Sequence, residues 1–179
     1  AFPAGVLSGN VAEELKLFIY ERNANQLAPM FGAEAVAAVF SNMPPLHEIV
    51  KRLRAVREFA QLAESSSLAA ANKRVGNILK KAESEVGGVA DSARCVEDAE
   101  KALFAALGEI APRADAAFES GDYTASLQAL AALKAPVDAF FDHVMVNADD
   151  PALKANRLAL LGQLHRTMNR VADLSRLAA

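Results

Sequence analysis

Hydrophobic residues recur every three or four positions along most of this chain, which is the spacing of amphipathic helices. The clearest case is residues 69–83, AAANKRVGNILKKAE. At roughly 100° per residue, its apolar positions share one face with Leu68. The opposite face carries Lys73, Arg74, Asn77, Lys80 and Lys81. The pattern predicts a helix with one buried face and one cationic face that contains no acid.

The same spacing predicts helices along the rest of the chain, separated by glycine and proline breaks. The expected helices are 11–28, 33–40, 45–62, 69–83 with a cap from 65–67, a long helix capped by Asp91 or Ser92, 123–133, a short helix opened by Pro136, and a last helix capped by Asp150. Pro112 should kink or split the long helix. The expected fold is a single all-α bundle of roughly seven to nine helices. Residues 1–9 are assigned to a linker or cut end, and residues 10–179 to one domain.

Composition supports one globular, helical domain. The 179 residues are 53% hydrophobic and only 6% aromatic, and strand-forming runs are scarce. The single cysteine cannot form an internal disulfide and fits a reducing compartment. No apolar run is long enough to cross a bilayer. We therefore expect a cytoplasmic protein with no membrane partner.

Charge is distributed unevenly along the chain. The net charge of −3 alone argues against nucleic-acid binding. Residues 51–81, however, hold eight basic and two acidic residues, whereas residues 83–122 hold ten acidic and three basic residues. Such a chain can present a local basic surface that suits a polyanion. A solvated helix face, or packing between oppositely charged helices, would also produce this segregation.

Catalytic motifs are absent from the sequence. It has no Gly-rich phosphate loop, no GxSxG and no cysteine pair. Asp142 and His143 resemble one element of metal-dependent phosphohydrolases, but further ligands at suitable spacing are missing. Acids close to Cys95 disfavour its thiolate. We expect no catalytic residue, no metal site and no active site within this chain.

Three long motifs carry a family resemblance. They are AAANKRVGNILKKA, VDAFFDHVMVNADDPALKANRLALL and LHRTMNRVADLSRL. An earlier segment, from Phe18 to Arg22, is similar to the entry helix of the same family. Together they resemble the C-terminal part of the bacterial glycyl-tRNA synthetase β subunit. The chain departs from the pattern at residues 23–25, where asparagines replace basic and aromatic residues, and it lacks a literal DALR tetrapeptide.

This resemblance implies a helical anticodon-binding domain related to the DALR module of class I arginyl-tRNA synthetases. The implied partners are the anticodon arm of glycine tRNA, whose second and third anticodon bases are cytosines, the remainder of the β subunit, and the α subunit. The chain would be a fragment of a ligase with no cofactor of its own. ATP and Mg would be used in the catalytic subunit of the parent enzyme.

RNA loops are bound by cations on phosphates and by side chains that stack on or bond to splayed bases. The candidates, in descending order, are Lys73, Arg74, Lys80 and Lys81 with the amide of Asn77, then Arg54 and Arg57, then Arg22. Tyr123 could stack on a base or be buried against the next helix. The alternative to RNA binding is a helical protein-interaction module whose basic face docks on an acidic partner.

Four further polar residues have expected structural roles. Asn72 lies at the edge of the apolar face, where a structural hydrogen bond is favoured over an RNA contact. Asn147 and Asn156 are expected to brace the turn before the last helix. Asp150 is expected to cap that helix, with Pro151 at its first position.

Overall fold

The fold is built from helices alone. The computed structural model describes residues 11–82 and 88–178, and this part forms eight α-helices and four short 3₁₀ helices without a strand. The all-α prediction is confirmed, whereas the segment 1–9 expected to be a linker lies outside the described residues. The elements are α1 (Val11–Phe31), α2 (Ala33–Phe40), η1 (Leu46–Glu48), α3 (Ile49–Phe59), α4 (Ser65–Lys81), η2 (Ser92–Arg94), α5 (Asp98–Glu119), α6 (Tyr123–Ala129), η3 (Leu130–Leu133), α7 (Lys134–His143), α8 (Pro151–Met168) and η4 (Leu174–Leu177).

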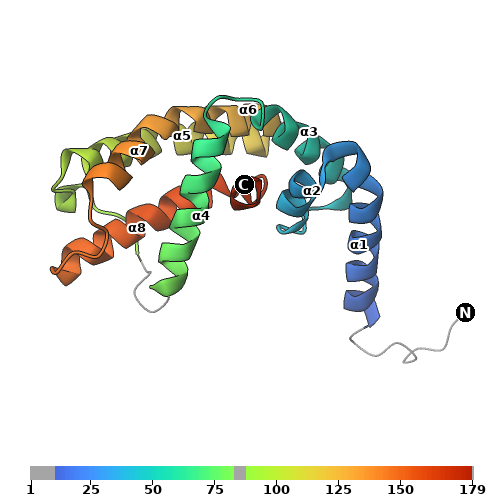
Figure 1. The fold of residues 1–179 in the computed structure, drawn as a ribbon, viewed down its shortest axis with the longest axis horizontal. Helices are drawn as coiled ribbons and strands as arrows, with labels where there is room; N and C mark the ends of the chain where they lie inside the picture. The colour runs from blue at the N-terminus through green and yellow to red at the C-terminus, as the bar shows by residue number, and fades with distance from the viewer. Residues whose placement is uncertain (1–10, 83–87, 179) are drawn as a thin grey trace, which may run out of the picture.

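The helices are arranged as an arch (Figure 1). Helices α7, α5, α6 and α3 follow one another along it, α4 and α8 lie beneath α5 and α7, and α1 descends from the opposite end beyond α2. The C-terminal η4 packs between α4 and α2. Large apolar side chains from the central helices, including Leu53, Leu103, Leu107, Phe140 and Leu160, are fully buried and form one continuous core. Burial of these amphipathic faces is the main stabilising term.

Two helix starts form as their sequences predict. Asp150 Oδ1 accepts hydrogen bonds from the Ala152 and Leu153 amides at 2.7 and 3.4 Å, and Pro151 opens α8. Asp122 Oδ1 likewise accepts from the Ala125 amide at 2.9 Å. Before it, Gly121 ends α5 with a φ of 78°, a left-handed conformation that glycine adopts without strain.

Other helix boundaries differ from the prediction. The serines at 65–67 lie inside α4 rather than before it, and Ser65 Oγ donates to the Leu62 carbonyl instead of capping. Asp91 caps the short η2, and the long helix α5 begins only at Asp98. Pro45 precedes η1 in an extended conformation. Side-chain capping signals recur every few residues here, so sequence alone does not select among them.

Neither internal proline ends its helix. Pro29 lies in the last turn of α1, and α5 continues through Pro112 to Glu119. A proline removes one backbone hydrogen bond and crowds the preceding turn. In α5 that cost is offset by burial on both sides of Pro112, where Leu107, Ile110 and Ala114 enter the core. Of the two expected effects of Pro112, a kink or a split, the split is therefore excluded.

The buried face of α1 differs from the one that its sequence predicts. Helical spacing marks Leu15, Phe18 and Ile19 as the apolar stripe of this helix, but Leu15 and Phe18 are 56% and 57% exposed. The helix packs on α2 and α3 through a different set of half-buried residues, namely Tyr20, Ala24, Leu27, Ala28 and Phe31. The same spacing predicts that Leu46, Val50 and Val96 face the core, but Leu46 of η1, Val50 of α3 and Val96 in the loop before α5 are all exposed. Spacing identifies an apolar stripe, but not whether a neighbouring element covers it.

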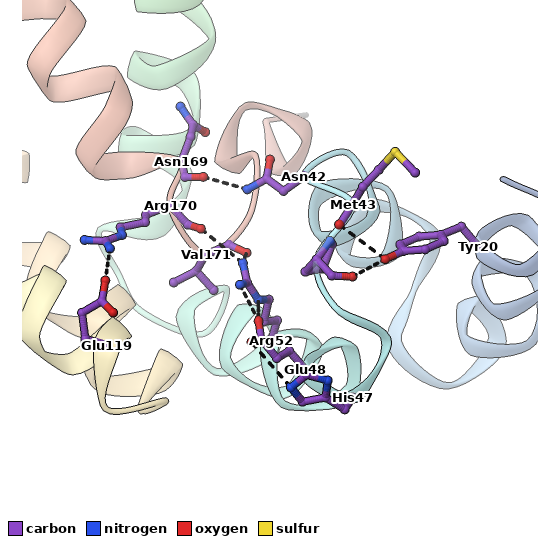
Figure 2. Close-up of polar contacts among 11 residues, drawn as sticks. Tyr20, Asn42, Met43, His47, Glu48, Arg52, Glu119, Asn169, Arg170 and Val171 are labelled. Atoms are coloured by element: carbon purple, nitrogen blue, oxygen red, sulfur yellow. Dashed lines mark hydrogen bonds and ion pairs between the residues drawn. The ribbon is translucent and has the colours of Figure 1, made fainter. Parts of the chain in front are cut away.

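The residues that follow α8 bond to the region of α2 and α3 and to α5 (Figure 2). The Asn169 carbonyl accepts from Asn42 Nδ2 at 2.8 Å. Buried Arg52 donates to the Arg170 and Val171 carbonyls at 3.2 and 3.0 Å and to Glu48 at 2.6 Å. The Arg170 side chain also joins this segment to α5 through ion pairs with Asp115 and Glu119.

A buried ion pair joins α5 to α8. Arg157 Nε lies 2.8 Å from Glu100 Oε1, and the two side chains are 7% and 1% exposed. Glu100 Oε2 also accepts from the Val96 and Glu97 amides at 3.1 and 2.8 Å. Burial raises the pKa of Glu100, but its hydrogen bonds from Arg157 and these amides outweigh burial and hold that pKa below its ordinary value.

We predict that Arg157→Leu lowers the free energy of unfolding by about 3–5 kcal/mol, because Glu100 would stay buried without its cation. Urea unfolding of the purified chain measures this change. Adding Glu100→Gln should recover part of the loss, since the amide oxygen still accepts a hydrogen bond but carries no charge. Arg176→Leu is the control: it breaks an exposed pair with Asp173 and should cost below about 1 kcal/mol. Equal losses in Arg157→Leu and Arg176→Leu would contradict the prediction.

Candidate nucleic-acid interface

Helix α4 presents the predicted cationic face to solvent. Leu68, Ala69, Asn72 and Val75 are buried against the rest of the domain. The five candidates on the opposite side are all exposed: Lys73, Arg74, Asn77, Lys80 and Lys81. The two-faced helix expected from the sequence is therefore confirmed, with an earlier start at Ser65 and an end at Lys81.

The structure divides the cations into paired and unpaired groups. Arg52, Arg157 and Arg170 are held by carboxylates and have structural roles. In contrast, the lysines of the α4 face form no ion pair with any residue that the structure describes, and neither do Arg22, Arg54 and Arg57. Exposed cations without acidic partners leave a positive potential available for an anion. A solvated helix face with mixed charges would lack this property.

Helix α8 borders one edge of the α4 face. The ring of His165 approaches Gly76, and a Cβ built on that glycine would lie 3.5 Å from His165 Nε2. That separation is an ordinary van der Waals contact, so α4 and α8 pack side by side at this point. The next residue, Arg166, is exposed.

Helix α7 borders the opposite edge. The guanidinium carbon of Arg74 lies 4.2 Å from the centroid of the Phe141 ring, a cation–π contact. Phe141 in turn packs edge-on against buried Phe140, with 5.6 Å between ring centroids. A groove of about 370 Å³ runs between the two helices beside this pair. Phe141 was read from the sequence only as part of a motif, and its contact with Arg74 follows from the tertiary packing.

The lower-ranked candidates lie on other helices. Arg54 and Arg57 are exposed on α3, which packs on α6 and α2, whereas α4 packs on η4 and α8. Arg57 stacks its guanidinium carbon 5.6 Å from the Phe31 ring centroid. Arg22 is exposed on α1 in a shallow groove beside Phe18. The structure thus places five candidates together on α4, whereas Arg54 and Arg57 lie on α3 and Arg22 lies on α1.

The asparagine residues of the motifs support the scaffold. Buried Asn72 donates to Asn169 Oδ1 at 2.8 Å and accepts from Asn169 Nδ2 at 3.0 Å. Asn156 binds both backbone groups of Asp91, at 2.7 and 3.1 Å, so it braces the loop before α5 and not the turn before α8. Asn147 is exposed and its side chain bonds to no described residue, which contradicts the expected bracing role. The turn is instead held by Arg157, which donates to the Met145 carbonyl at 2.8 Å.

Tyr123 is unavailable for stacking on a base. It is 6% exposed, and its ring lies 5.4 Å from that of Phe118 and 4.8 Å from the Arg52 guanidinium carbon. Burial raises its pKa, and the hydrogen bond with Glu48 acts in the same direction. Its role is to complete the packing around Arg52.

Comparison with known proteins agrees with this geometry. The profile of the DALR anticodon binding domain matches residues 68–175, which begin within α4 and end within η4. The chain belongs to the DALR anticodon-binding domain family. The match begins at the helix that carries the five first-ranked candidates.

Relatives extend the similarity beyond that match. The chain is 66% identical over 181 residues to the glycine–tRNA ligase β subunit of Thiobacillus denitrificans, covering 100% of the chain and 26% of the relative. It is 61% identical to that of Delftia acidovorans (93% and 24%) and 58% identical to that of Dechloromonas aromatica (100% and 26%). The chain therefore spans about a quarter of the length of these relatives.

Three further features of the DALR domain concern metal binding, its cysteine and membrane insertion. Among residues 11–82 and 88–178, no three His, Cys, Asp or Glu side chains are placed to share a metal ion, and Asp142 and His143 belong to no such group. Burial raises the pKa of the Cys95 thiol, and the negative charge of Glu100 raises it further. No helix in this part of the chain is long and apolar enough to span a membrane.

We predict that His165 makes stability depend on pH. Its half-buried ring has a pKa below the ordinary value of 6.5, because burial and nearby Arg166 disfavour the charged form more than Asp173 favours it. The unfolded chain therefore binds more protons just below that pH, and stability should fall as the pH decreases through this range. Urea midpoints at about pH 7.5 and about pH 5.5 measure the effect.

His165→Gln should reduce the change in stability between the two pH values. His143→Gln, at an exposed residue of α7, should leave that change as it is in the parent chain. An identical loss of stability in the His165→Gln variant would show that another group is responsible.

Proposed function

We propose that this DALR domain binds the anticodon arm of glycine tRNA through the exposed face of α4. The observation that carries the proposal is the set of exposed cations Lys73, Lys80 and Lys81, which form no ion pair within residues 11–82 and 88–178. They lie beside Arg74 and Asn77 on the helix where the family match begins. Cations of this kind hold phosphates, and an amide or guanidinium group can bond to exposed base edges. Arg54, Arg57 and Arg22 are secondary contacts for more distant parts of the tRNA.

The domain would contribute tRNA recognition to glycine aminoacylation without catalysing it. Its curated relatives are named as β subunits of glycine–tRNA ligase. In this proposal, ATP and Mg act in the catalytic α subunit, the chain itself holds no cofactor, and the complex works in the cytoplasm.

The remainder of the β subunit is the proposed protein partner. Leu15, Leu17 and Phe18 lie close together in the first half of α1 and are each more than half exposed, as is Met30 in its last turn. Apolar groups grouped on one helix commonly mark a contact with another protein surface. The relatives are about four times as long as this chain, so their additional residues offer such a surface.

We predict that Lys73→Glu/Lys80→Glu weakens binding to the glycine tRNA anticodon arm by at least about tenfold, because two phosphate contacts are lost and replaced by repulsion. The slope of log K against log salt should decrease by about 1.4–1.8, since each contact contributes about 0.7–0.9. Fluorescence anisotropy at several salt concentrations measures both quantities.

The matched control is Lys101→Glu/Arg113→Glu, which makes the same charge change at exposed positions on α5. It should retain most of the affinity. Equal affinity of the α4 variant and the parent chain would remove the site from α4. A parent chain that shows no preference for glycine tRNA over other tRNAs would favour the protein-interaction module instead.

A further inference from the structure

The groove between α4 and α7 differs in chemistry from the rest of the α4 face. Its walls are Ser67 and Arg74 from α4, and Asp138, Phe141 and Asp142 from α7, with two alanines of α4 between them. Lys73, Lys80 and Lys81 do not line it. One edge of the face is therefore purely cationic, whereas the α7 edge combines an arginine, an aromatic ring and two carboxylates.

Arg74 and Phe141 provide planar surfaces at this groove. The guanidinium carbon lies 4.2 Å from the ring centroid, so each group limits the movement of the other. Phe140, which is fully buried, supports Phe141 from behind. Aromatic rings and guanidinium planes are the surfaces on which proteins stack unpaired RNA bases. The small side chains of the alanines leave the space beside the pair open.

The two carboxylates differ in their availability. Asp138 accepts from Lys134 Nζ at 2.6 Å and from Ser67 Oγ at 3.0 Å, so its oxygens are already engaged. Asp142, one turn further along α7, is exposed and forms neither a hydrogen bond nor an ion pair with any described residue. A free carboxylate repels phosphate but accepts hydrogen bonds from N–H groups. Among nucleic-acid groups, it therefore selects a base edge that carries an exocyclic amino group.

We propose that this groove holds one unstacked nucleobase bearing an exocyclic amino group, stacked beside the Arg74–Phe141 pair and bonded to Asp142. The assignment rests on the proposed function, because the phosphates of the same RNA would lie on the cationic edge of α4. Cytosine fits and uracil does not, since uracil presents a carbonyl oxygen where cytosine presents its amino group. Asp142 is then a specificity-determining residue, and Phe141 contributes affinity.

The experiment uses the 179-residue chain and the hairpin of the glycine tRNA anticodon arm. Further hairpins replace one loop cytidine at a time with uridine. For the parent chain, one such replacement should weaken binding about tenfold, the loss of a hydrogen bond to a charged group. Asp142→Ala should reduce that ratio to about one and leave the salt dependence unchanged, because Asp142 contacts no phosphate.

Two further variants separate the proposed contacts from general effects. Asp149→Ala makes the same charge change at an exposed residue outside the groove and should keep the cytidine preference. Phe141→Leu retains an apolar side chain against Phe140 but removes the aromatic face, and should weaken binding about fivefold or more. Circular dichroism and urea midpoints verify that each variant is folded.

The outcomes distinguish this inference from the function on which it rests. Normal cytidine discrimination and affinity in both Asp142→Ala and Phe141→Leu would overturn the inference and leave the α4 proposal standing. Equal loss of discrimination in Asp149→Ala and Asp142→Ala would also overturn it, since net charge would explain both. A parent chain that binds the anticodon hairpin no better than an unrelated hairpin of equal length would overturn the two proposals together.

Discussion

The hydrogen bonds made by the segment after α8 hold the arch together. Arg52 of α3 donates to the Arg170 and Val171 carbonyls, while Asn169 bonds to Asn42 and Asn72. These contacts join positions about 100 or more residues apart in the sequence. Arg52 also lies between aromatic rings, with its guanidinium carbon 5.0 Å from the Phe118 ring centroid. Buried polar groups of this kind fix geometry because an unsatisfied partner is costly.

This constraint determines which face of α4 is available to a ligand. The Asn72–Asn169 pair and the packing of Gly76 on His165 hold the apolar side of α4 against the C-terminal residues. The cations on the opposite side are consequently exposed, although the chain carries a net negative charge. A rigid helix presents them at fixed spacing, which suits a ligand with regularly spaced charges. Several acidic residues lie away from this face and form ion pairs with structural cations, such as Glu100 with Arg157 and Asp115 with Arg170.

Local signals in the sequence predicted helix boundaries correctly where the residues at the boundary favoured a single structural role. The proline after Asp150 favoured a helix cap at that residue, and Gly121 before Asp122 marked the end of one helix and the start of another. The cationic face of α4 followed from helical periodicity alone. The predictions failed where several solutions competed: Pro112 does not interrupt α5, and Leu15 and Phe18 of α1 are exposed. Long-range burial decided these cases, and it is not encoded within a short window.

The sequence by itself determined that the chain is helical, that α4 has a cationic side, and that the domain resembles an anticodon-binding module. Periodicity and charge order are properties of neighbouring residues, so they are legible without coordinates. Only the tertiary structure showed which cations are neutralised, that Asn156 braces the Asp91 loop, and that Phe141 and Asp142 stand beside Arg74. Those facts depend on contacts between α4, α7 and α8, which folding brings together from distant parts of the chain.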